Sequence, residues 1–158
     1  PTNLYANPGF DTDSVWSKGT WTIGSGIASK AAGAASGIAQ SHVSVPPITV
    51  VAGKTYRFHA SPLVLTAGGI QARISGGTAQ DGPLVPASGI ILARLTAVSG
   101  NNTLSFRADA SFAGSIDNAV VFIETPDCLP QGTHHFWLQP SNDGVPGPVS
   151  GPFTVVVV

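Results

Sequence analysis

The chain has 158 residues, of which 42% are hydrophobic and only 9% charged, with a formal net charge of −1. The apolar fraction is sufficient for a core and excludes a disordered linker, while 19 Gly and 13 Pro residues interrupt the sequence too often for long helices. The seven Lys and Arg residues are scattered instead of forming a stripe, so we expect no nucleic-acid partner.

The sequence predicts neither a membrane segment nor a secretion signal, because it lacks a signal-peptide pattern and any apolar run of about 18 residues. It begins with Pro1, which is compatible with removal of an initiator Met, and we expect synthesis in a host cytoplasm. A single cysteine, Cys128, excludes an intrachain disulfide and a cysteine-based zinc cluster. No cofactor is predicted.

Taken in chain order, the first strand signals are short and separated by turn residues. Trp16 and residues 21–23 flank the Lys-Gly-Thr sequence at 18–20, which predicts a tight turn. Residues 30–37 are small and include two glycines. This composition disfavours a helix and favours a loop or a strand that faces a close neighbour.

The following segments alternate more clearly between apolar and polar residues. Residues 38–45 predict a strand that the Pro-Pro pair at 46–47 closes or bends. Further strands are predicted over residues 48–51, 55–65 and 70–75. The apolar faces of the last two are formed by Tyr56, Phe58, Ala60, Ile70, Ala72 and Ile74.

The pattern continues after a Gly- and Pro-rich stretch at residues 76–89, which predicts a long loop. Strands are predicted over residues 90–98, 103–108 and 115–124, with a turn at 99–102. About eight or nine strands spaced near ten residues apart, without strand–helix alternation, indicate an all-β sandwich or jelly roll.

A boundary is predicted at residues 125–127, Thr-Pro-Asp. Beyond it, residues 133–138 and 153–158 predict two strands joined by a polar loop over 141–151. Residues 125–158 would then form a single hairpin, which is marginally stable in water on its own. We therefore expect this hairpin to dock on the first domain, to pair with another chain, or both.

Four sequence blocks occur in a recognisable order. They are Asn-Pro-Gly-Phe-Asp at 7–11, a Trp-containing block at 16–24, Ala-Gly-Lys-Thr-Tyr-Arg at 52–57, and a block with Ser-Ile-Asp-Asn at 111–120. Together they resemble the carbohydrate-binding-module-like, galactose-binding-like jelly rolls of tailed-bacteriophage structural proteins. The resemblance covers residues 3–124 and implies a fold more firmly than a ligand.

From this resemblance we expect two domains. Residues 1–124 would form a jelly-roll β-sandwich, and residues 125–158 a C-terminal β-hairpin. Residues 133–158 resemble the last two strands of a fibronectin-type or immunoglobulin-like domain. Half of such a domain cannot bury its own core, which again indicates docking or strand exchange.

Two tryptophans are candidates for glycan binding. Trp16 and Trp21 flank a turn, where exposed aromatic rings could stack on sugar rings. Packing in the core is the commoner fate of tryptophan, since one side chain buries on the order of 200 Å². Both alternatives stay open from the sequence.

The C-terminal strand is the candidate assembly interface. Its residues alternate so that both faces are apolar, and both should therefore be covered. An exposed edge of this kind promotes aggregation. It is either an interior strand of this chain or a strand shared across a subunit interface. Its residues are Phe153, Thr154, Val155, Val156, Val157 and Val158.

Catalytic and metal-binding patterns are poor. The eight acids are scattered without an evident acid–base pair. The resemblance implies that Asp11 and Asp117 meet in space, as acids do in calcium-binding relatives, although those relatives usually carry Glu in place of Asp11. The alternative is that Asp117 and Asn118 form a turn. His134 and His135 are adjacent on a predicted strand and cannot chelate one metal together without distortion.

The resemblance implies a non-enzymatic bacteriophage virion structural protein, in the first place a capsid decoration or cement protein on the virion surface, and the low charge and the apolar C-terminal strand agree with this expectation. Its partners would be the major capsid protein or other virion proteins, together with copies of itself, for example in a trimer. Two alternatives remain. One is a tail-associated or receptor-binding module for host surface glycans, and the other is a sugar-binding module of a bacterial polysaccharide-degrading system.

Overall fold

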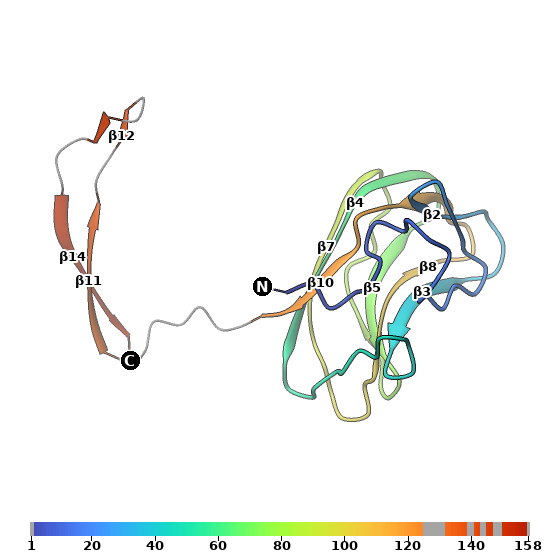
Figure 1. The fold of residues 1–158 in the computed structure, drawn as a ribbon, viewed down its shortest axis with the longest axis horizontal. Coiled ribbons are helices and arrows are strands. Elements are labelled where there is room, and N and C mark those ends of the chain that lie inside the picture. Colours follow the sequence, from blue (N-terminus) through green and yellow to red (C-terminus); the bar gives the residue numbers. More distant parts are fainter. Residues whose placement is uncertain (1, 125–131, 139–140, 143–144, 147–149, 158) are drawn as a thin grey trace. The chain divides into compact units, whose positions relative to one another are not determined.

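The computed structural model describes residues 2–124, 132–138, 141–142, 145–146 and 150–157. Contacts divide the chain into two compact units, Pro1–Glu124 and Thr125–Val158, which we call the N-terminal and C-terminal units. All regular elements among the described residues are β-strands, which confirms the all-β prediction (Figure 1).

Among the described residues, ten strands lie in the N-terminal unit and four in the C-terminal unit. The first ten are β1 (Thr22–Gly24), β2 (Ile27–Lys30), β3 (Ser36–Ser41), β4 (Thr55–Ala67), β5 (Ile70–Ser75), β6 (Gln80–Asp81), β7 (Gly89–Thr96), β8 (Thr103–Ala108), β9 (Ala113–Ile116) and β10 (Val120–Ile123). The last four are β11 (Gly132–Leu138), β12 (Ser141–Asn142), β13 (Val145–Pro146) and β14 (Ser150–Val157).

The larger sheet of the N-terminal unit is antiparallel and is built around the long strand β4. Its strand order is β1-β2-β9-β4-β10, with β7 also paired to β4. Strand β7 lies along one edge of β4, and β9 and β10 follow one another along the other, so that Leu63 is flanked by Gly89 and Ile116. The thirteen residues of β4 are therefore long enough to serve as the common partner of three strands.

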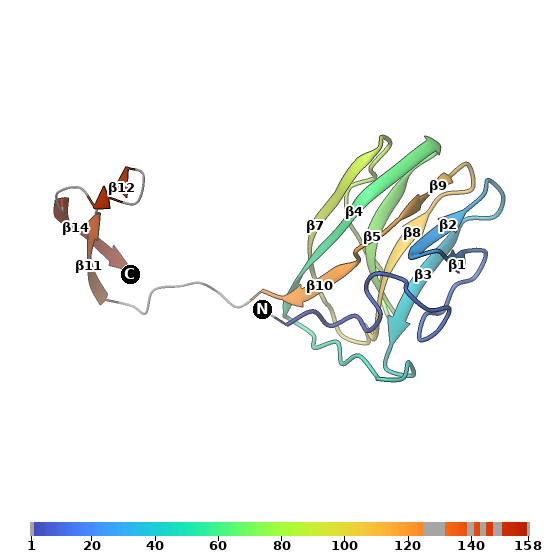
Figure 2. The ribbon, with the colours of Figure 1, turned by 45° about the horizontal axis from the view of Figure 1, so that its top comes forward.

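The smaller sheet has the order β3-β8-β5-β6 and packs against the larger one (Figure 2). Phe58 of β4 and Phe106 of β8 meet between the layers, edge to face, with ring centroids 6.0 Å apart. The predicted alternation in β5 is confirmed, because every second side chain is buried. Residues of both sheets thus form one continuous apolar core.

Two predicted strands in the middle of the sequence are wrong in extent. The strand predicted over 38–45 ends at Ser41, and residues 48–51 form no strand. The Ser44 hydroxyl accepts a hydrogen bond from the Ser41 amide at 2.8 Å, and the Ser44 amide donates to the Ser41 carbonyl at 3.0 Å. These local bonds close a turn in place of the ladder, which is how serine commonly competes with sheet structure.

The strand predicted over 115–124 is interrupted and forms β9 and β10. Asn118 has a positive φ of 46°, and its amide donates to the Asp117 carboxylate at 2.6 Å. The Asp117 carbonyl accepts from the Ser61 amide at 2.9 Å. Asp117 and Asn118 therefore interrupt the strand through a local side-chain bond, and β10 then pairs with β4.

The N-terminal segment covers the outer edge of β10. The Leu4 amide donates to the Val121 carbonyl at 2.7 Å, and the Asn3 side chain bonds both the Val121 amide and the Ala119 carbonyl. The buried Gln40 side chain anchors the same segment, since its amide group donates to the Ala6 carbonyl and accepts from the Ala6 amide. An otherwise open sheet edge is thereby paired.

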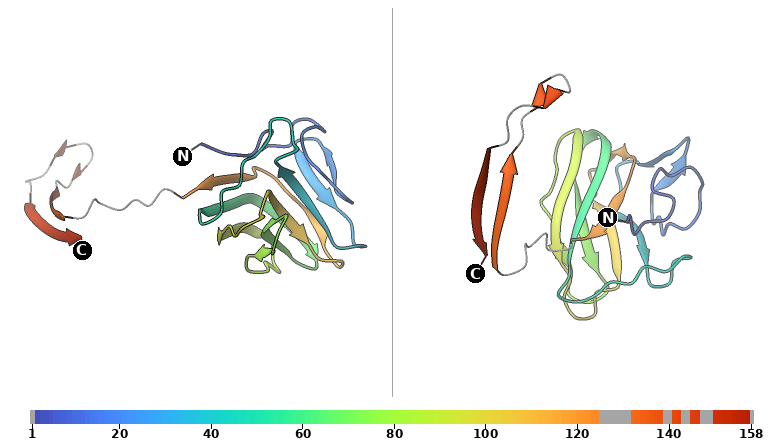
Figure 3. Two further views of the ribbon diagram at one scale, coloured as in Figure 1. Left: turned by 90° about the horizontal axis from the view of Figure 1, so that it is seen from below. Right: turned by 60° about the vertical axis from the view of Figure 1, so that its left-hand side comes forward.

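The C-terminal unit consists of a two-stranded ribbon, β11 and β14, with a short β12–β13 ladder between them in sequence (Figure 3). His134 lies opposite Val155, and Phe136 lies opposite Phe153. The register shifts between Phe136 and Leu138, which marks a bulge. Within the loop predicted at 141–151, the described residues include β12 and β13. Cys128 and Val158 lie outside the described residues.

Candidate interaction surfaces

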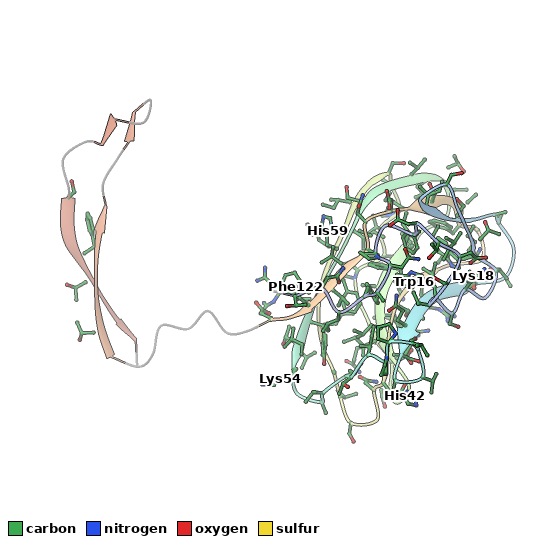
Figure 4. All side chains as sticks on the ribbon, viewed as in Figure 1. Trp16, Lys18, His42, Lys54, His59 and Phe122 are labelled. Carbon is green, nitrogen blue, oxygen red and sulfur yellow. The ribbon has the colours of Figure 1, made fainter. Side chains whose placement is uncertain are left out.

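The two candidate glycan-binding tryptophans lie in the core. Trp16 is 7% exposed, packs against the rings of Tyr5 and Phe10 at 4.8 and 5.0 Å, and donates its indole Nε1–H to the Asn7 carbonyl (Figure 4). Trp21 is 3% exposed and stacks on Phe112 at 5.3 Å. Neither ring offers an open face for a sugar, so core packing is the role that the structure gives both residues.

Tyr5 completes this aromatic cluster. Its ring also lies 6.1 Å from that of Phe106, and its hydroxyl is buried without a hydrogen-bond partner among the described residues. Burial in this apolar surrounding raises the pKa of the Tyr5 hydroxyl well above its ordinary value. The cluster is a packing feature, because Tyr5, Phe10 and Trp16 are all buried and pack on one another.

The predicted calcium-binding positions are brought to the same end of the unit. The Ala119 amide donates to the Pro8 carbonyl at 2.8 Å, which places the segments of Asp11 and Asp117 near one another. Asp117 is engaged by Asn118, whose backbone and side-chain nitrogens both bond its carboxylate. Within the described ranges, no group of three or more His, Cys, Asp or Glu side chains could hold a metal ion.

A surface that the sequence analysis did not identify lies on the outer side of the larger sheet, and we call it the β10–β4–β7 face. It consists of Arg57, His59, Leu92, Arg94, Val120 and Phe122. Strand pairing aligns them in rows, since His59 is opposite both Leu92 and Val120, and Arg57 is opposite both Arg94 and Phe122. Directly opposed residues of neighbouring strands share one face of a sheet.

Glu124 joins the two arginines of this face. Its Oε1 accepts from Arg57 Nη2 at 2.8 Å, and its Oε2 accepts from Arg94 Nε at 2.7 Å. The hydrogen bonds from Arg94 and then Arg57 hold the pKa of the Glu124 carboxyl below its usual value. Exposed ion pairs contribute little to stability, so the main effect of this triad is to fix the directions of two guanidinium groups.

Side chains of this face line an open pocket of about 570 Å³. This volume is within the range of ligand-binding pockets. Leu92, Val120 and Phe122 supply its apolar lining, with Pro83 beside them, and His59 and the two arginines supply its polar groups. Leu92 is 59% exposed although it lies on a regular strand. Figure 4 labels His59 and Phe122 on this side of the unit.

The predicted assembly strand is placed in β14. Its backbone pairs with β11 from Gly132 opposite Val157 to Leu138 opposite Ser150. Phe153 is 49% exposed. Among the described residues, the sheet that contains β14 has two strands and no facing layer is present within the ribbon itself. Val158, the last residue of the predicted interface, lies outside the described residues.

Comparisons of this chain with protein-family models, with curated proteins and with solved structures find no match. The resemblance to phage jelly rolls therefore rests on the four sequence blocks alone. Over the described part of the chain, no helix is long and apolar enough to cross a membrane.

Proposed function

We propose that this chain is a non-enzymatic virion structural protein that decorates or cements the surface of a bacteriophage capsid through its C-terminal unit. In this proposal residues 1–124 form a jelly-roll β-sandwich, and β14 contacts the major capsid protein or another virion protein. The virion setting comes from the sequence resemblance, whereas the assignment of the contact comes from the geometry of the C-terminal unit.

The observation that carries the proposal is the incomplete sheet of the C-terminal unit. Strands β11 and β14 form a two-stranded ribbon among the described residues, and such a ribbon is marginal in water without a further strand or a covering layer. Strand β14 contains no charged residue that would oppose pairing with another strand. Addition of a partner strand would satisfy its backbone groups, which is a known mode of protein assembly.

The jelly-roll part is supported by the connectivity of the N-terminal unit. Sequence-distant strands are neighbours in both sheets, as in the β2–β9–β4 and β3–β8–β5 series. Two antiparallel sheets whose strands are linked by connections that pass from one sheet to the other are typical of jelly rolls. A structural role, as opposed to catalysis, is supported by the acids that form ion pairs on the surface, such as Asp13 with Lys18 and Asp81 with Arg73.

The burial of both tryptophans removes the main support for the glycan-binding alternatives. A receptor-binding or polysaccharide-directed module would need another aromatic platform, because Trp16 and Trp21 present no open ring face. Capsid decoration needs no such platform. We therefore prefer capsid decoration to glycan binding as the function of this chain.

The test is binding to capsids of the phage that encodes the chain, prepared without this protein. We expect the full chain to bind in stoichiometric amounts, and a chain that lacks residues 153–158 to lose binding. Phe153→Lys should weaken binding strongly, because in this proposal the half-exposed Phe153 side chain becomes buried and an unpaired charge there would be costly. Val64→Lys is the matched control, since Val64 is 51% exposed on β4. Unchanged binding of the truncated chain would reject the C-terminal contact.

A further inference from the structure

We propose that the β10–β4–β7 face docks an extended polypeptide segment of a protein partner, one that places a carboxylate beside apolar side chains. This surface belongs to the N-terminal unit, whereas the strand β14 of the decoration hypothesis belongs to the C-terminal unit. The inference therefore goes beyond the decoration hypothesis and does not depend on the virion setting.

The apolar part of this face consists of side chains that lie outside the core. Along β7, Ile91 and Leu95 point inward and are buried, whereas Ile90 and Leu92 point outward and are 45% and 59% exposed. The outward Phe122 of β10 lies in the same pocket as Leu92. Contiguous exposed apolar groups on regular strands mark interaction sites more often than single exposed residues do.

The charged part of this face is the Arg57–Glu124–Arg94 triad. Two guanidinium groups and one carboxylate leave a net charge of +1 at the pocket rim (2 − 1 = +1). The Glu124 carboxylate contacts the Nε and Nη2 groups of both Arg57 and Arg94. Among the described residues, neither Nη1 group has an acceptor. Guanidinium groups held in this way can bind a second carboxylate with little loss of side-chain entropy.

The balance of groups favours a peptide over a saccharide. A sugar presents many hydroxyls and requires a comparable set of hydrogen-bonding side chains, but apart from the arginines the pocket offers the His59 side chain and mainly aliphatic or aromatic carbon. A peptide with leucine-like or phenylalanine-like side chains next to Asp or Glu would match both the apolar lining and the positive rim. Arg and aromatic residues are also the usual anchors of protein interfaces.

The experiment is selection of a random twelve-residue peptide display library on the immobilised full chain, followed by affinity measurement with the enriched peptides. We expect enrichment of peptides that carry an acid between apolar residues. The Arg57→Gln/Arg94→Gln double variant should weaken their binding at least about tenfold, since charged hydrogen bonds of this kind contribute more than one order of magnitude in affinity. Leu92→Ser should weaken binding as well.

Two controls separate docking from loss of fold. Arg107→Gln removes a charge from the other sheet, where Arg107 lies on β8, and should leave binding unchanged. Denaturation midpoints of all variants establish that they fold. Leu92→Ser is preferred to a change at Phe122, because Leu92 is the more exposed of the two.

Three results would overturn the inference. The first is a selection without acidic–apolar sequences, or peptides whose binding ignores the arginine and Leu92 variants. The second is concentration-dependent self-association that the same variants abolish, which would assign the face to a second copy of this chain. The third is binding on a glycan array that requires Leu92 or the arginines, which would assign it to a saccharide.

Discussion

The two units of this chain cover their apolar residues in different ways. In the N-terminal unit two sheets face each other, and side chains such as Phe58 and Phe106 are covered from both sides. In the C-terminal unit the described strands form two two-stranded ladders, β11–β14 and β12–β13, and Phe153 is half exposed. The N-terminal unit therefore closes its own core, and our proposal assigns the C-terminal ribbon a partner that covers it.

This difference is the reason why our proposal places assembly on the C-terminal unit. A unit with a closed core gains nothing from a partner except at specialised patches, such as the β10–β4–β7 face. A two-stranded ribbon gains both backbone pairing and apolar burial when another strand or layer is added.

The largest effect is expected from a cavity in the N-terminal core. Phe106 is fully buried between the rings of Tyr5 and Phe58, so Phe106→Ala should lower the free energy of unfolding by about 3–5 kcal/mol. Urea denaturation followed by the fluorescence of the buried tryptophans measures this loss. Phe153→Ala in the C-terminal unit is the matched control and should change it by less than about 0.5 kcal/mol. Similar effects at both positions would remove the distinction between the units.

A second effect tests how closely the turns of the N-terminal unit pack. Gly68 has a φ of 72°, and an added Cβ would lie 2.3 Å from the Phe112 amide nitrogen. Gly53 has a φ of 80°, but open space surrounds its Cβ position. Gly53→Ala should therefore cost about 1–2 kcal/mol from the backbone conformation alone, and Gly68→Ala clearly more. Equal losses in urea denaturation would show that the Gly68 turn relaxes freely.

A third effect concerns the anchor of the N-terminal segment. Gln40 is 1% exposed and makes two hydrogen bonds to the Ala6 backbone. Gln40→Ala leaves both backbone groups without these partners and should cost about 1–3 kcal/mol. Gln71→Ala, at a half-buried outward position on β5, is the control and should cost less. Faster hydrogen exchange at the Leu4 amide in the Gln40 variant would trace the loss to the segment that covers β10.

The smallest effect is the acid dependence of the Arg57–Glu124–Arg94 triad. Because the arginines lower the pKa of Glu124, its stabilising contribution is present above the ordinary carboxyl pKa of 4.5 and is lost as the pH falls through the lowered value. Wild type and Glu124→Gln should therefore differ slightly in denaturation midpoint at about pH 7 and converge at about pH 3. A difference that grows at acid pH would contradict the assigned sign.

The sequence predicted those strands in which a period of two residues is uninterrupted. Residues 55–60 of β4 and the strands β5 and β8 follow this pattern, and their apolar positions are buried. The prediction failed where side chains form local bonds that periodicity does not report. Ser44 closes a turn after β3, and Asp117 with Asn118 interrupts the segment 115–124 that was predicted as one strand.

The candidate surfaces were predicted unevenly for a related reason. The C-terminal strand was recognisable because its apolar residues are consecutive in sequence. The triad joins residues 57, 94 and 124, which come together only through the register of β4 with β7 and β10. A signal was present in the outward apolar residues Leu92 and Phe122, but without the strand pairing they could not be assigned to one face.

Hydrogen exchange of the full chain, alone and bound to capsids, tests the central claim most directly. We predict that amides of β4 and β8 exchange slowly in both states, because a closed core protects them. Amides of β14 should exchange rapidly in the isolated monomer and become protected when the chain is bound. Protection of β14 in the isolated monomer equal to that of β8 would contradict the account, since the C-terminal unit would then be as self-sufficient as the N-terminal one.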